Sequence, residues 1–131
     1  MRPSIVTSAI AMLATAVSGH TVNCWGKALH ADIDVFPEAV NFIEKGQDRV
    51  SVRPNGCKNL YCSDDMSVRF CNDLDKPRVM GKRNILDSIN VLATECKEEY
   101  KGKTVAGGVV DHSDHWSVVV QGHDDLCKSR Y

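Results

Sequence analysis

The chain has 131 residues, 43% of them hydrophobic and 25% charged, and its 16 basic residues are nearly balanced by 17 acidic ones. A near-neutral chain lacks the basic surplus that would favour nucleic acid or an anionic membrane as a partner. The length is that of one ordinary domain. Composition therefore argues only against binding to nucleic acid or anionic membranes. The fold and the function have to be inferred from the order of the residues.

The first nineteen residues have the arrangement of a secretory signal peptide. Arg2 provides the positive start, residues 5–14 are apolar, and small residues follow from Ala14 to Gly19. The apolar run is about half of the ~20 residues that cross a bilayer, so a membrane anchor is the weaker interpretation. Cleavage after Ala16, Ser18 or Gly19 would fit. We expect residues 1–19 to be removed and residues 20–131 to form a single secreted domain without membrane insertion.

Six cysteines follow the signal segment: Cys24, Cys57, Cys62, Cys71, Cys96 and Cys127. An even number in a small exported chain predicts three disulfide bridges, and the sequence leaves all of their pairings open. A thiolate metal site would need closer pairs than Cys57 and Cys62, which have four residues between them. We therefore expect no metal and no cofactor.

In chain order, the pattern first predicts a strand over 21–25. Asp32 or Asp34 can cap a helix that has Pro37 in its first turn and ends near Gly46. Alternation then predicts strands over 49–53 and 66–71. Between them, residues 55–65 are expected to form a loop that contains Cys57 and Cys62 and is stapled by their disulfides. A polar loop is expected to continue through Pro77, and the basic residues Lys76, Arg78, Lys82 and Arg83 are interpreted as solvated.

The second half of the chain predicts another helix and two more strands. Apolar residues recur at helical spacing from Ile85 to Cys96, with Asn84 or a neighbour as the cap. Strands are expected over 104–110 and 116–120, with a turn at 111–115 and a bulge at Gly107-Gly108. The fold class is α+β: a two-layer, disulfide-stapled sandwich with a mainly antiparallel sheet of four or five strands and two helices on one face.

Catalytic signals are weak. The sequence has no Gly-x-Ser-x-Gly motif and no phosphate-binding loop, and paired cysteines leave no free thiolate. The histidines and carboxylates of residues 111–116, with His123 and its two aspartates further on, could hold a metal ion or supply acid and base to a small hydrolase. The same residue types are common in turns. The sequence therefore favours a protein that is not an enzyme, with a hydrolase or metal binder using His112 and His115 as a minor alternative.

Several segments together resemble a known group of proteins. They are Val-Asn-Cys-Trp-Gly (22–26), Ser-Val-Arg-Phe-Cys-Asn-Asp (67–73), the helix ending in Cys96, the Gly-Gly strand and His-Trp-Ser-Val-Val-Val (115–120). This pattern resembles small cysteine-rich proteins secreted by plant-pathogenic fungi, above all one branch of the secreted-in-xylem effectors of vascular-wilt fungi and their avirulence relatives. More distantly it is similar to the KP4-type killer toxins of smut fungi.

The resemblance to the effectors implies a non-enzymatic virulence factor that is secreted into the plant host, in the apoplast or xylem, with entry into host cells left open. It implies action through a protein partner, either a co-secreted effector or a host protein, with effects on plasmodesmata or host immunity. The similarity to KP4 implies the alternative of a toxin that impairs calcium uptake. This chain has fewer cysteines than the KP4 pattern and no net positive charge, which weakens the toxin alternative.

The last two strands suggest where a partner could bind. Valines fall on both faces of residues 118–120, and in a two-layer fold one face of the sheet has no helices over it. We therefore expect an exposed interface near a sheet edge, with Trp116 and Val119 as its candidate residues.

Overall fold

The computed structural model describes residues 19–26 and 29–122. Most of the expected signal segment, Cys127 and the residues 123–125 lie outside the described residues.

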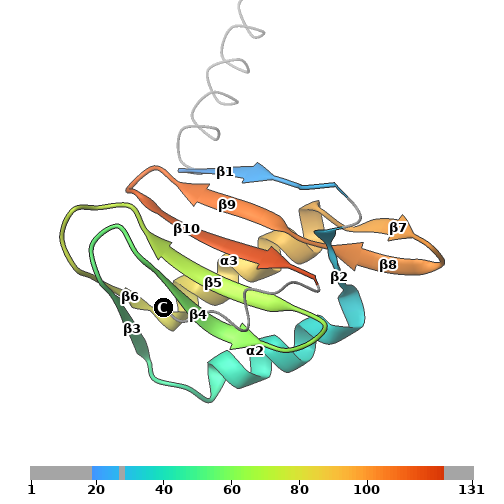
Figure 1. Cartoon of the computed structure of the whole chain (residues 1–131), viewed down its shortest axis with the longest axis horizontal. Helices are drawn as coiled ribbons and strands as arrows, with labels where there is room; N and C mark the ends of the chain where they lie inside the picture. Colours follow the sequence, from blue (N-terminus) through green and yellow to red (C-terminus); the bar gives the residue numbers. More distant parts are fainter. Residues whose placement is uncertain (1–18, 27–28, 123–131) are drawn as a thin grey trace, which may run out of the picture.

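An antiparallel sheet of five strands forms one layer (Figure 1). Its order is β1-β9-β10-β5-β4, so β10 lies at the centre and β1 and β4 form the edges. The strands are β1 (His20–Asn23), β9 (Gly108–His112), β10 (Trp116–Gln121), β5 (Ser67–Asn72) and β4 (Cys57–Cys62). The strands predicted over 66–71 and 116–120 are confirmed. Every second residue of each strand faces the core, as Val68 and Phe70 do in β5 and Val118 and Val120 in β10, and the residues between them in β10 are buried as well.

Two helices form the other layer and cover one face of this sheet (Figure 1). They are α2 (Phe36–Glu44), which follows the short 3₁₀ turn η2 (Ile33–Val35), and α3 (Lys82–Glu95). Asp32 caps the 3₁₀ turn, because its carboxylate accepts the backbone N–H of Asp34 at 3.0 Å. The predicted α+β architecture with helices on one face is confirmed. Fully buried side chains from both layers form the core between them, among them Phe70, Ile85, Ile89, Leu92, Val118 and Val120.

Two smaller antiparallel sheets complete the fold. One has the order β2-β8-β7 and the other pairs β3 with β6. Their strands are β2 (Ala31–Asp32), β7 (Glu98–Tyr100), β8 (Lys103–Ala106), β3 (Arg49–Val52) and β6 (Arg78–Gly81). The strand predicted over 49–53 is β3, whereas β2, β6 and β7 were not predicted.

The prediction of one strand over 104–110 is wrong, because the chain changes sheets at Gly107 and β8 and β9 lie in different sheets. Gly108 has φ +136°, and a Cβ built there would lie 2.2 Å from the carbonyl oxygen of Asn23. Only glycine allows this backbone conformation together with so close an approach to β1. The glycine pair therefore marks a switch between sheets and not a bulge within one strand.

Residues 55–65 were predicted to be a loop, and this is wrong because they contain β4. The burial of β4 does not alternate cleanly, since it is an edge strand whose register shifts between Asn59 and Tyr61. The basic residues expected in a solvated loop lie instead in β6 and α3, apart from Lys76. Arg78 contacts Asp114, and Lys82 contacts Asp48.

Two disulfide bridges are described, Cys24–Cys96 and Cys57–Cys71. The first ties the end of β1 to the end of α3, and the second joins directly opposed residues of β4 and β5. Cys62 is also disulfide-bonded. The prediction of a disulfide-stapled fold is confirmed, and none of the five described cysteines is free.

Candidate functional site

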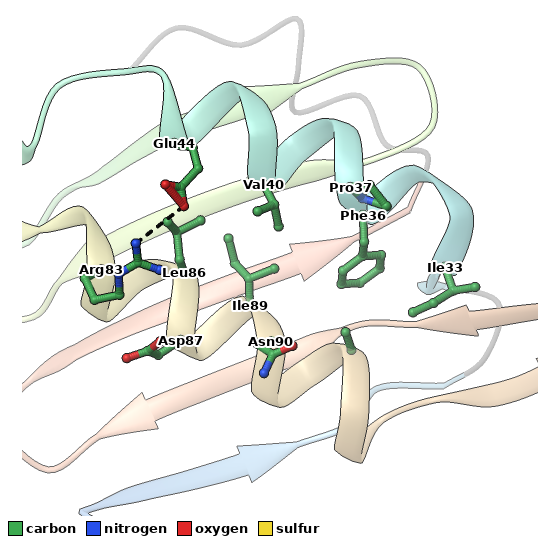
Figure 2. Close-up of a pocket in the computed structure, with 11 residues that line it drawn as sticks. Ile33, Phe36, Pro37, Val40, Glu44, Arg83, Leu86, Asp87, Ile89 and Asn90 are labelled. Atoms are coloured by element: carbon green, nitrogen blue, oxygen red, sulfur yellow. Dashed lines mark ion pairs between the residues drawn. The ribbon is translucent and has the colours of Figure 1, made fainter.

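An apolar groove lies between helices α2 and α3 and has a volume of about 460 Å³ (Figure 2). Its floor consists of the buried side chains of Phe36, Leu86 and Ile89. Its walls are formed by Ile33, Pro37, Val40, Glu44, Arg83, Asp87, Asn90 and Ala93. We call this hollow the α2–α3 groove.

The groove follows from the spacing of residues on the two helices. On the α2 side, Ile33, Pro37 and Val40 recur every three or four residues, and on α3 the same spacing joins Leu86, Ile89 and Ala93. Such residues share one helix face. Phe36, Leu86 and Ile89 are covered, whereas Val40 and Ala93 are only half-buried. The apolar faces are therefore wider than the contact that the two helices make with each other.

Charged side chains border this apolar surface. Arg83 Nη2 lies 3.6 Å from Glu44 Oε1 and closes one end of the groove with an ion pair across the two helices (Figure 2). One turn further along α3, the exposed carboxylate of Asp87 has no hydrogen-bond or ion-pair partner among the described residues. An exposed ion pair contributes little to stability. Because Arg83 pairs with Glu44, the negative charge of Asp87 is left uncompensated on the rim of the groove.

A second hollow, of about 230 Å³, lies on the other side of α3. The ring of His112 stacks on Trp116, with ring centroids 3.6 Å apart and the planes 4° from parallel. His112 Nε2 lies 2.9 Å from Ser88 Oγ, and the His20 ring centroid is 5.7 Å away. Asp87 lines this hollow as well as the α2–α3 groove.

The environment of His112 favours its neutral form. Burial lowers the pKa of the imidazole from its ordinary value of 6.5, and the nearby charge of His20 lowers it further. The carboxylates of Asp114 and Asp111 act in the opposite direction without reversing the shift. His112 is thus uncharged at neutral pH.

The Ser88–His112 pair does not have the arrangement of an activated nucleophile. Ser88 Oγ also lies 3.2 Å from the carbonyl oxygen of Asn84, one turn earlier in α3. A hydroxyl has one proton to donate. When that proton is on the Asn84 carbonyl, His112 Nε2 carries the hydrogen of the Ser88–His112 bond and cannot act as a base. Among the described residues, no carboxylate is hydrogen-bonded to the His112 ring.

The structure does not bring His112 and His115 into one cluster. His115 is exposed in the turn after β9, has φ +69°, and is absent from the lining of the His112 hollow. Within residues 19–26 and 29–122, no group of three or more histidines, cysteines and carboxylates could hold a metal ion.

The two candidate interface residues are buried. Trp116 is 5% exposed and Val119 is 8% exposed, so the prediction that Val119 lies on an exposed face is wrong. Both residues belong to the central strand β10 and not to an edge. Trp116 instead packs between His112 and Phe70, and its ring centroid is 5.8 Å from that of Phe70.

The free edge near α2 is also poorly suited to strand pairing. Edge strand β4 has a register shift after Asn59 and carries the exposed Lys58, two features that discourage another strand from adding to a sheet. Phe42 of α2 is 60% exposed beside Tyr61 of this strand, with ring centroids 5.5 Å apart. Neither Trp116, Val119 nor the β4 edge therefore provides the exposed interface that was predicted near a sheet edge.

Comparison of the chain with models of known protein families and with curated protein sequences gives no match. Among the described residues, no helix is both long and apolar enough to cross a membrane. The sequence reasoning missed the α2–α3 groove. In the sequence Val40 and Ala93 only continue the apolar faces of the two helices, and it is the structure that shows each of them half-buried.

Proposed function

We propose that this chain is a secreted, non-enzymatic protein-binding module that serves a plant-pathogenic fungus as a virulence effector. Its partner is a co-secreted effector or a host protein, and the α2–α3 groove is the docking surface. The observation that carries the proposal is this groove, an apolar hollow of about 460 Å³ with a charged rim. The effector role itself rests on the resemblance of the cysteine and strand pattern.

An apolar groove with a polar rim is the usual form of a site that takes the apolar face of a partner segment. Phe36, Leu86 and Ile89 provide a rigid floor because they belong to the core. The bridge Cys24–Cys96 fixes the end of α3, so the helix that forms one wall is held in place. A preformed site of this kind lowers the cost of ordering on binding.

The toxin alternative receives less support from the charges. A channel blocker usually presents a basic face. Here the guanidinium of Arg78 lies 3.7 Å from Asp114, and that of Arg83 lies 3.6 Å from Glu44. The ammonium of Lys82 lies 3.4 Å from Asp48. Of the clustered basic residues, Arg78, Lys82 and Arg83 thus each have an acidic side chain within 4 Å.

The test uses two matched substitutions. Val40→Glu places a charge in the wall of the groove, and Val79→Glu makes the same change at a valine of β6 that is 53% exposed and outside the groove. We expect Val40→Glu to abolish the biological effect in the plant and the crosslinking to the partner, while Val79→Glu leaves both unchanged. Equal thermal midpoints of the two purified variants would establish that folding is not the cause.

A hydrolytic function predicts the opposite result for these substitutions. Ser88→Ala or His112→Ala would then remove the effect, while Val40→Glu would retain it. That result would replace the binding proposal with an enzymatic one.

A further inference from the structure

We infer that the occupant of the α2–α3 groove is an amphipathic helix of a partner protein, an inference that rests on the proposed function. A lysine or arginine on this helix pairs with Asp87. Two features lead to this partner. One is the shape of the groove, and the other is the charge left unpaired on its rim.

The shape favours a helix as the occupant. Both walls are helices whose residues recur at three- and four-residue spacing, which creates ridges and grooves that a third helix can match. The apolar floor runs from Phe36 of α2 to Leu86 and Ile89 of α3 (Figure 2). A partner helix would place aliphatic side chains one turn apart on this floor.

The charge favours a basic residue beside those aliphatic side chains. The groove lining contains three charged groups: Glu44, Arg83 and Asp87. Glu44 and Arg83 compensate each other across the two helices, with 3.6 Å between Oε1 and Nη2. One negative and one positive charge thus cancel, and the carboxylate of Asp87 remains without a described partner.

Asp87 is also well placed to be reached. It borders both the α2–α3 groove and the smaller hollow beside His112, so it stands on the ridge between two depressions. A long basic side chain that extends over this ridge can reach the carboxylate while its aliphatic stem covers apolar surface. An acidic partner would meet only Arg83 and would have to displace Glu44.

The experiment uses synthetic amphipathic peptides of about 18 residues, long enough to form helix on binding. Three peptides share one leucine face and differ only at a flanking position, which is Lys, Gln or Glu. A fourth peptide has the same composition as the Lys peptide in scrambled order. Binding is measured by fluorescence anisotropy and located by chemical-shift changes at Val40 and Ala93.

We expect the Lys peptide to bind wild-type protein about 3- to 10-fold more tightly than the Glu peptide at low salt, which is the range of one exposed ion pair replaced by repulsion. The ratio should fall to about 1 in Asp87→Asn and in roughly 1 M salt. Asp75→Asn, at an exposed aspartate outside the groove, is the matched control and should retain the ratio. The scrambled peptide should not shift Val40 or Ala93.

Several outcomes would overturn the inference. The ratio could survive in Asp87→Asn, the Glu peptide could bind best, or no peptide could bind at the groove. The proposed function fails separately, if Val40→Glu leaves the biological effect and partner crosslinking intact. Loss of the effect in Val40→Glu without peptide binding would retain the docking surface and reject the basic helix as its occupant.

Discussion

The hydroxyl of Ser88 lies 2.9 Å from Nε2 of His112, and this bond joins helix α3 to strand β9 of the five-stranded sheet. The same imidazole stacks on Trp116 at a centroid distance of 3.6 Å. His112 therefore connects the two layers of the fold through its neutral ring. A proton on this ring would add a charge that burial and His20 both disfavour.

The first prediction concerns pH. Because the pKa of His112 is lowered in the folded protein, the unfolded chain takes up this proton first as the pH falls. The contribution of His112 to stability is thus complete above about pH 6.5, the unfolded value, and declines as the pH falls toward the folded pKa. Denaturant midpoints of the wild type and His112→Gln, measured at pH 7.5 and pH 5 in ~0.1 M salt, will check this.

We expect His112→Gln to lose less stability on acidification than the wild type. His115→Gln changes an exposed histidine outside the His112 hollow and serves as the control. Equal acid sensitivity of His112→Gln and wild type would contradict the assignment of this effect to His112.

The second prediction concerns Asn72, a buried side chain at the end of β5. Its amide nitrogen donates toward the carbonyl oxygens of Val52, Arg53 and Lys76 at 3.4, 3.2 and 2.9 Å. Its amide oxygen accepts the backbone N–H of Leu74 at 3.0 Å. Asn72→Ala leaves these backbone groups unpaired and should lower the free energy of unfolding by about 2–4 kcal/mol. Chemical denaturation measures the change.

Asn41→Ala is the matched control, since Asn41 is exposed on α2 and its side chain has no comparable bonds among the described residues. A loss in Asn72→Ala no larger than in Asn41→Ala would show that the network has no energetic importance.

The strand and the helix that were most clearly predicted from the sequence are those with a strict period. Met66 to Cys71 alternates and α3 repeats its apolar residues every three or four positions, because each buries one face against the same core. Strand β4 was missed because an edge strand with a shifted register has no clean alternation. The assignment of Val119 to an exposed face was wrong because local period does not reveal which strand is central.

The candidate site was harder to predict for the same reason. In each helix taken by itself, Val40 and Ala93 belong to an apolar face of the kind that packs into a core. Only the packing of α2 beside α3 determines that Phe36 and Ile89 are covered while Val40 and Ala93 line an open groove. The histidines and carboxylates of residues 111–116 likewise suggested a joint role for His112 and His115, but the direction of each side chain depends on the end of β9 and on the positive φ of His115.

The third prediction concerns the switch between sheets at Gly108. A methyl group there would lie 2.2 Å from the carbonyl oxygen of Asn23, and φ is +136°. Gly108→Ala must displace β1 or distort β9, and we expect a loss of several kcal/mol, on the order of 3 or more. Gly26→Ala is the control, because a Cβ at Gly26 meets nothing within 4 Å. Thermal unfolding of both variants measures the difference. Equal midpoints would contradict the requirement for glycine at position 108.

The last prediction concerns Gly19, which lies at the boundary of the expected signal peptide. The backbone N–H of Ser113 donates to the carbonyl oxygen of Gly19 at 2.9 Å, and Gly19 has φ +62°. This bond continues the pairing of β1 with β9 by one step beyond His20 and His112. A chain that begins at His20 lacks the acceptor, and the four-residue edge strand β1 then loses its first tie to the turn after β9.

We therefore expect a chain beginning at Gly19 to be more stable than one beginning at His20 by about 1 kcal/mol, the net value of one hydrogen bond. Parallel denaturant titrations of the two purified chains will measure the difference. Small residues at Ala16 and Ser18 also suit a peptidase that cleaves after Ser18. If residues 1–18 are removed as a signal peptide, N-terminal sequencing of the processed chain is expected to give Gly19 first. Equal stabilities would contradict the energetic role of this hydrogen bond, and His20 as the first residue would place the cleavage after Gly19.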